Sequence, residues 1–417
     1  MPSATPRARA ALLAAAAAAI LLILPGTAGA ATGGATEPES VPSEPAGKAP
    51  AGKTPFDRQG MWIWYVSRAH GGSVGRIVAR AKRSGVGTLY VKAGDAGNTW
   101  SQFSPSLVRR LKRAGLDVCA WQFVYGSNPV AEARAAAVAI ARGADCFVID
   151  AEGHYEGRYA AADRYVRILR RRAGPDYPIS LASFPYVDYH PSFPYSVFFG
   201  PGGATYNQPQ MYWKTIGTSV RRVYEHTYLF NRLWGHPIYP LGQTYDRPGR
   251  VPVKRFRRFA RNYGGLQPSW WEWDHTPGGL WRALRPRLAR ISRYRPVFDH
   301  PLLKRGSRGD LVVWAQQHLR GAGLRVPVTG FYGRLTRRSV IAFQRREGMR
   351  ADGVIGTRTW NTLLEHDPVR VSWARRAARR SAALRSGAAT ASQLSRSAPL
   401  SASLPARAYE IDPGPRP

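Results

Sequence analysis

Two carboxylates placed two residues apart are the strongest chemical signal in this 417-residue chain. Asp150 and Glu152 directly follow the apolar run Cys146–Ile149. Side chains at positions i and i+2 of a strand leave the same face, so these two groups should lie close together. Neighbouring carboxylates repel, which raises the proton affinity of one of them and leaves an acid beside an anion. Cleavage of a glycosidic bond needs that division of roles; a structural pair that binds arginine is the simpler alternative.

Polar and aromatic side chains near other apolar runs are candidates for binding sugars. Flat rings suit the CH faces of sugars, while amide, ammonium and phenol groups suit their hydroxyl and acetamido groups. The predicted substrate-binding residues of this group are Trp62, Trp64, Lys92, Gln122, Tyr125, Gln210, Tyr212, Trp271 and Trp273. About half of the tryptophans are expected to fill the outer layer of the barrel predicted below instead. Glu272, between two tryptophans, is a spare carboxylate.

Eight short apolar runs, with starts roughly 30 residues apart, must position these side chains. They are Met61–Val66, Thr88–Val91, Leu116–Phe123, Cys146–Ile149, Ile179–Ala182, Gln210–Trp213, Pro237–Leu241 and Leu266–Trp273. Helical patterns separate most of them, such as Val74–Arg83, Ser106–Ala114, Val130–Arg142 and Tyr159–Arg172. The alternation predicts an α/β fold, a (β/α)8 TIM-type barrel over residues 55–300, whose chemistry lies at the C-terminal ends of the strands.

A doubly wound open sheet is the alternative, but no glycine-rich phosphate loop follows the first apolar run. The stretch 186–204 is rich in proline and aromatic residues and has no clean helical pattern, so a functional loop is expected there.

The N-terminus carries the features of an export signal. Arg7 and Arg9 precede the apolar run Ala11–Leu24, and small residues follow up to Ala30. The run is shorter than the roughly 20 residues that a membrane span needs, so a signal peptide over residues 1–30 is favoured over an uncleaved anchor. We therefore expect a secreted, extracellular protein associated with the cell wall. Residues 31–54 are predicted to be a disordered linker, and residues 367–417 a basic low-complexity tail.

The chain is strongly basic, with 61 Lys and Arg against 26 Asp and Glu and a formal charge of +35. Export argues against nucleic acid as the partner, so the charge is interpreted as attraction to anionic cell-wall polymers. We expect a monomer with no stable membrane span after signal cleavage.

Two cysteines exclude a disulfide-dense scaffold and a four-cysteine zinc site. Cys119 and Cys146 lie on neighbouring predicted strands and fit either one disulfide or two buried thiols. The nine histidines lack the spacing of zinc ligands, so neither a metal nor a cofactor is expected.

The barrel sequence resembles the lysozyme-type muramidases of glycoside hydrolase family 25, through residues 88–93 (TLYVKA), the Leu116–Phe123 strand and residues 147–153 (FVIDAEG). That resemblance implies that Glu152 is the general acid and that Asp150 stabilises the transition state or the substrate acetamido group. The same run also resembles the family 18 chitinase motif, except that Val148 replaces its middle Asp. The first run, Gly60–Trp64, lacks the Asp expected of family 25.

A second compact segment occupies residues 301–366. Val312, Leu319, Val340, Phe343 and Leu363 have helical spacing between glycine-rich turns, which predicts a small all-α core of three helices. The segment resembles the peptidoglycan-binding domain family, in particular at residues 330–333 (GFYG) and 352–356 (DGVIG). The resemblance implies peptidoglycan as the partner, with Phe331 and Asp352 in the ligand-contacting loops.

These features predict an exported, muramidase-like cell-wall glycoside hydrolase that binds peptidoglycan through its C-terminal domain. Two alternatives remain at this point. One is a non-catalytic peptidoglycan-binding or structural protein with a degenerate barrel, and the other is a hydrolase of a different exported polysaccharide.

Overall fold

The computed structural model describes residues 53–285 and 287–373. The predicted signal peptide, nearly all of the predicted linker and most of the predicted tail lie outside these residues. The described residues up to Val371 belong to one compact unit, which holds a barrel and a helical C-terminal domain. Within the described ranges, no helix has both the length and the apolar composition needed to cross a bilayer.

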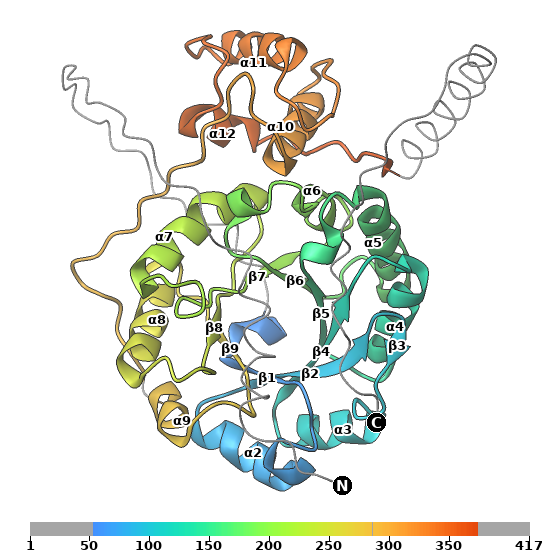
Figure 1. Ribbon diagram of the computed structural model, residues 1–417, viewed down its shortest axis with the longest axis vertical. Coiled ribbons are helices and arrows are strands. Elements are labelled where there is room, and N and C mark those ends of the chain that lie inside the picture. The colour runs from blue at the N-terminus through green and yellow to red at the C-terminus, as the bar shows by residue number, and fades with distance from the viewer. Residues whose placement is uncertain (1–52, 286, 374–417) are drawn as a thin grey trace, which may run out of the picture. The chain divides into compact units, whose positions relative to one another are not determined.

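Eight parallel strands form a nearly closed barrel, which confirms the predicted fold class (Figure 1). The strands are β1 (Gly60–Ile63), β2 (Thr88–Asp95), β4 (Asp117–Val124), β5 (Cys146–Ala151), β6 (Ile179–Ser183), β7 (Tyr206–Pro209), β8 (Leu241–Gln243) and β9 (Ser269–Trp271). Their order is β7-β6-β5-β4-β2-β1-β9-β8, and single bridges from Asn207 to Ile238 and from Gln210 to Leu241 link the two ends of that path. The short strand β3 (Asn98–Thr99) pairs antiparallel with β2.

Helices surround the barrel, each following one of the parallel strands in the sequence. They are α2 (Val74–Arg83), α3 (Pro105–Arg113), α4 (Pro129–Ala141), α5 (Tyr159–Ala173), α6 (Tyr195–Phe198), α7 (Val220–Asn231), α8 (Arg250–Asn262) and α9 (Gly278–Leu284). In α3, Leu107, Val108 and Leu111 are buried. The Ser104 side chain accepts a hydrogen bond from the Leu107 amide and Pro105 occupies the first turn, which fixes where this helix begins.

The sixth predicted strand was wrong by four residues. Residues 210–213 do not form strand β7; they follow it. After Pro209 the backbone turns on itself, because the Met211 amide bonds to the Pro209 carbonyl at 2.9 Å and the Tyr212 amide to the Gln210 carbonyl at 2.8 Å. The seventh strand also starts later than predicted, since Pro237 and Pro240 have no amide to donate to a ladder.

The barrel interior holds its own apolar cluster, closed at the N-terminal end of the strands by the 3-10 turn η1 (Pro55–Asp57). Phe56 inserts between the inner rings, with its centroid 4.6 Å from Tyr206 and 5.6 Å from Tyr239. Figure 1 shows this short blue turn inside the ring of strands. The side chains at the C-terminal ends of the strands therefore lie on a packed layer of aromatic rings, and not over an open channel.

Cys119 and Cys146 are direct register partners on β4 and β5, and they form a disulfide. Both are fully buried in the inner cluster. This resolves the two alternatives left by the sequence in favour of the cross-link.

Replacing both cysteines by alanine is expected to lower the free energy of unfolding by about 3 kcal/mol, because the bond closes a loop with a sequence separation of 27. Denaturant unfolding of the variant and of the wild type measures the effect. The reduced wild type is the control, since it keeps the sulfur atoms and loses only the cross-link. Equal midpoints for all three proteins would contradict the expectation.

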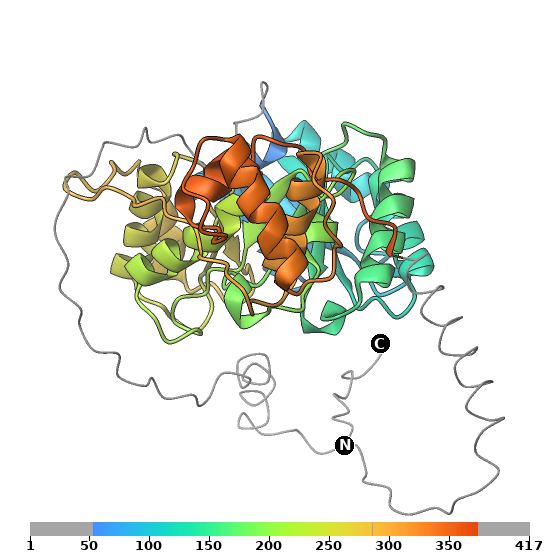
Figure 2. The ribbon, with the colours of Figure 1, turned by 90° about the horizontal axis from the view of Figure 1, so that it is seen from above.

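The C-terminal domain consists of three helices, α10 (Asp310–Gly321), α11 (Arg334–Arg346) and α12 (Thr357–Leu363), as the spacing predicts. They pack together as one small bundle (Figure 2). Two buried glutamines hold its turns: Gln316 Oε1 accepts from the amides of Thr329 and Gly330, and Gln344 Oε1 accepts from the Gly353 amide.

The helix α10 also contacts the barrel. The Asp310 carboxylate accepts hydrogen bonds from the Ser196 amide at 2.7 Å and the Ser196 hydroxyl at 2.6 Å. Trp314 Nε1 donates to the Leu233 carbonyl at 2.7 Å. The helical domain is therefore joined to the barrel by buried contacts as well as by the connecting chain.

Candidate active site

Asp150 and Glu152 lie at the C-terminal end of β5, where a TIM barrel carries its chemistry. Asp150 is buried, 5% exposed, and Glu152 is half-buried. A single amide group joins them, because Gln210 Nε2 donates to Asp150 Oδ1 at 3.0 Å and to Glu152 Oε1 at 3.0 Å. The structure thus adds Gln210, which the sequence predicts separately, to the predicted carboxylate pair.

Burial raises the pKa of both carboxyls. The pKa of Asp150 is well above its ordinary value, because burial and the neighbouring Glu152 both disfavour its anion. The pKa of Glu152 is raised by burial, against the opposing effect of the bond from Gln210. The pair therefore retains a proton at a pH where ordinary carboxyls are ionised, and Glu152 is the more exposed of its two members.

We call the opening of the barrel at the C-terminal ends of the strands the mouth. Lys92 lies on β2 on the side of the mouth, and its ammonium group is enclosed by aromatic rings and one carboxylate. Its Nζ lies 2.5 Å from Asp95 Oδ2 and 4.5, 4.6 and 5.0 Å from the ring centroids of Trp64, Trp100 and Trp121. Burial lowers the pKa of Lys92, while Asp95 opposes that shift. The contacts of Lys92 are therefore with the protein itself. Its ammonium group holds the Trp64 ring in place and lowers the pKa of Asp150.

Aromatic rings form the floor and one wall beside the pair. Trp62 is buried and donates from Nε1 to the Ser269 hydroxyl at 3.1 Å, so it belongs to the floor. Trp271 packs against both Trp62 and Trp64, with centroids 5.5 and 5.7 Å away. Trp64 is 37% exposed and can offer a face to a ligand.

Two tyrosines complete the mouth. Tyr212 is half-buried, and its pKa is raised by burial and by the charges of Tyr245, Asp150, Glu152 and Glu272. Tyr125 donates its hydroxyl to Asp95 Oδ1 at 3.1 Å, and its ring lies 4.8 Å from that of His154.

Two predicted binding residues are placed away from the mouth. Gln122 lies in the layer between barrel and helices, where its amide donates to the carbonyls of Ala96 and Glu132. Trp273 is buried against Trp281, 4.7 Å between centroids, in the outer shell. The Gln122 amide and the Trp273 ring therefore make contacts within the barrel wall and do not face a ligand at the mouth.

A carboxylate–imidazole couple follows β9, on the opposite side of the barrel from β5, and sequence reasoning missed its imidazole. Glu272 is 3% exposed and accepts bonds from the amides of Asp274 and His275 and from His275 Nδ1. The bond to Glu272 raises the pKa of His275, and burial with Glu272 nearby raises the pKa of Asp274 to about 6. A Glu-x-x-His spacing directly after a strand is the signal that could have revealed the couple.

In the helical domain, Phe331 is 40% exposed and carries the Arg308 guanidinium 4.4 Å from its ring centroid. Asp352 Oδ1 accepts from the Val354 amide and from Gln344 Nε2, both at 2.9 Å, so its carboxylate holds the turn. These bonds lower the pKa of Asp352. Across the described residues, no group of three His, Cys, Asp or Glu side chains is arranged to hold a metal ion.

Residues 308–363 match the family model of the peptidoglycan binding domain. A solved peptidoglycan-binding protein from Clostridioides difficile is 35% identical over 15% of this chain, which spans 40% of that protein's length, with a TM-score of 0.15. A chitinase from Chromobacterium violaceum is 9% identical over 54% of this chain and 98% of its own, with a TM-score of 0.40. An endo-β-1,4-mannanase from Thermotoga petrophila is 8% identical over 52% and 68%, with a TM-score of 0.40. No curated protein sequence matches the chain.

Proposed function

We propose that the chain is an exported cell-wall glycoside hydrolase of the muramidase type, which cleaves a glycosidic bond with Glu152 and Asp150. The observation that carries the proposal is the buried carboxylate pair that shares one Gln210 amide at the mouth of the barrel. Such a pair holds one protonated and one ionised carboxyl group, and cleavage of a glycosidic bond uses both.

In this mechanism Glu152 gives its proton to the glycosidic oxygen as the bond from that oxygen to the sugar C1 breaks. Asp150, deeper in the barrel, stabilises the positive charge at C1 or orients the acetamido group of the sugar, which is the candidate nucleophile. Water then supplies the new hydroxyl, and its proton returns to the pair. Trp271 and Trp64 would hold the sugar rings against the mouth.

The alternative is a barrel that binds without cutting, which the missing acid on the first strand favours. Incubation of purified cell walls with the full chain separates the two, because only a hydrolase lowers turbidity and releases reducing ends. Mass spectrometry of the soluble products then identifies the bond that is cut.

The helical domain is proposed to retain the protein on peptidoglycan, with Phe331 as a contact. Phe331→Ala is expected to weaken retention on insoluble peptidoglycan about tenfold, because an exposed aromatic face contributes about 1 kcal/mol or more on binding. Co-sedimentation over a range of wall concentrations measures the change. Val251→Ala, which trims a 70% exposed side chain on α8, is the control. Equal losses for both variants would refute a specific role for Phe331.

A further inference from the structure

Four consecutive outer helices of the barrel carry cations and no acidic residue. In Figure 1, α8, α9, α2 and α3 follow one another from the left side of the ring along its bottom. Their Lys and Arg residues are Arg250, Lys254, Arg255, Arg257, Arg258, Arg261, Arg282, Arg76, Arg80, Lys82, Arg83, Arg109, Arg110, Lys112 and Arg113. We call the surface that these residues form the basic arc.

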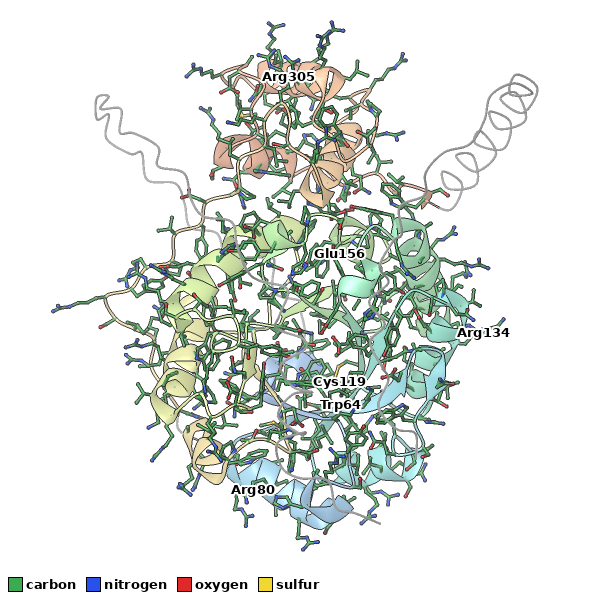
Figure 3. All side chains as sticks on the ribbon, in the orientation of Figure 1. Trp64, Arg80, Cys119, Arg134, Glu156 and Arg305 are labelled. Carbon is green, nitrogen blue, oxygen red and sulfur yellow. A yellow bond between two sulfur atoms is a disulfide. The ribbon has the colours of Figure 1, made fainter. Side chains whose placement is uncertain are left out.

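The basic arc faces solvent. Its exposed members are Arg76, Lys82, Arg83, Arg109, Arg110, Lys112, Arg113, Arg250, Arg255, Arg258, Arg261 and Arg282. In Figure 3 the labelled Arg80 projects outward from the lower rim, whereas Trp64 lies inside the ring. The arc is continuous from α9 to α2, since the Arg80 guanidinium lies 5.7 Å from the Trp281 ring centroid.

Few acids neutralise this surface. Between residues 53 and 373, leaving out residue 286, the arc forms an ion pair between Lys112 and Asp145 at 2.5 Å. At the border of the arc, Arg58 pairs with Asp117 at 3.2 Å. Other members use backbone carbonyls, as Arg257 does with Ala283 at 3.0 Å. The positive charge is thus largely uncompensated by the protein itself.

The four helices of the arc lack the acids that other parts of the barrel carry, so composition alone does not explain the arc. Five of these acids lie at or just after the C-terminal ends of strands, around the mouth: Asp95, Asp150, Glu152, Glu272 and Asp274. A general excess of arginine would add cations everywhere, but it would not remove acids from four adjacent helices.

This arrangement has an energetic cost in the free protein. Like charges three or four residues apart on a helix destabilise it by about 0.2–0.5 kcal/mol per pair. Arg109 with Arg113, Lys254 with Arg258, and Arg257 with Arg261 have that spacing. Burial, with Arg261 nearby, lowers the pKa of Arg257 to about 10. A polyanion would relieve this repulsion and release the counterions of both partners.

We propose that the basic arc binds a linear phosphodiester polymer of the cell envelope, at a site distinct from the barrel mouth and from the helical domain. The planar guanidinium group matches phosphate oxygens in a two-point contact, and arginine makes up all but three members of the arc. Neighbouring helices lie about 10 Å apart, so four of them present a surface suited to a chain rather than to a small ion. The envelope as the source of the polymer rests on the proposed export, but the binding surface does not.

The test uses the full chain and a synthetic poly(glycerol phosphate) of defined length as the probe. The variant Arg109→Gln, Arg110→Gln, Arg113→Gln removes three exposed cations from α3. It is expected to bind at least about tenfold more weakly and to lower the slope of log K against log salt by about 2. The matched control, Arg334→Gln, Arg338→Gln, Arg345→Gln, removes three exposed cations from α11 and should change binding less than about twofold.

Equal weakening by the two triple variants would overturn the proposal, since net charge alone would then explain binding. Equal affinity for polyglutamate, or for duplex DNA, would overturn the assignment to a flexible phosphodiester chain. If the α3 triple fails to fold, the triple Arg76→Gln, Lys82→Gln, Arg83→Gln on α2 replaces it, with the same expected loss. Polymer binding should be unchanged in Glu152→Gln, which separates this proposal from hydrolysis.

Discussion

Glu152→Gln is expected to reduce the release of reducing ends from peptidoglycan by about 10³-fold while leaving binding to the wall intact. Glutamine has the shape of the native side chain, and its Oε1 can still accept the bond from Gln210 that now holds Glu152. It has no proton to transfer to a leaving oxygen, and general acid catalysis contributes roughly 10²–10⁴-fold in enzymes. Initial rates on purified walls, with co-sedimentation of the same samples, measure both quantities.

Glu156→Gln is the matched control for this experiment. Glu156 lies four residues further along the same loop, where it bonds to His190 and Ser192 rather than to the carboxylate pair. Its replacement should leave the rate within about twofold. Equal rates for wild type and Glu152→Gln, or no release by either protein, would favour the non-catalytic barrel.

The first five strands of the barrel could be predicted from the sequence because each is a dense apolar run bounded by a helical pattern. Strand β5, for example, starts at Cys146 as predicted. The last three strands are short, and prolines interrupt their apolar runs. Pro209 ends β7, and the apolar residues Met211 and Trp213 after it are buried in coil. Apolar content alone cannot separate a strand from buried coil in such a segment.

The candidate site could be predicted where strand alternation applies. Asp150 and Glu152 share a face, and the same rule places Gln122 outside the barrel, because its neighbour Trp121 lies inside. Assigning Gln122 to the mouth overlooked this alternation. Trp273 follows the end of β9, where alternation no longer holds, so its burial against Trp281 depends on tertiary packing. The bridge from Gln210 depends on a contact 60 residues away in the sequence, which no local pattern reveals.

Asp150→Asn is expected to move the alkaline limb of the pH–rate profile to lower pH by about one unit or more, and to lower kcat about 10²-fold. In the wild type, burial raises the pKa of both carboxyls, and repulsion by Glu152 raises that of Asp150 further. The pair therefore gives up its last proton only at a pH above the ordinary carboxyl range. Activity should be lost as the pH rises through that value, because no proton remains for the leaving oxygen.

With asparagine at position 150, Glu152 has no anionic neighbour and loses its proton at lower pH. The sign of the shift does not depend on which carboxyl holds the proton in the wild type, because the last ionisation belongs to the coupled pair. The position of the alkaline limb is measured from kcat/KM as a function of pH on a soluble wall fragment. Asp246→Asn, at an exposed residue of the β8 loop, is the control and should leave the limb in place. A limb that stays fixed or moves upward in Asp150→Asn would show that the pair does not titrate as one catalytic unit.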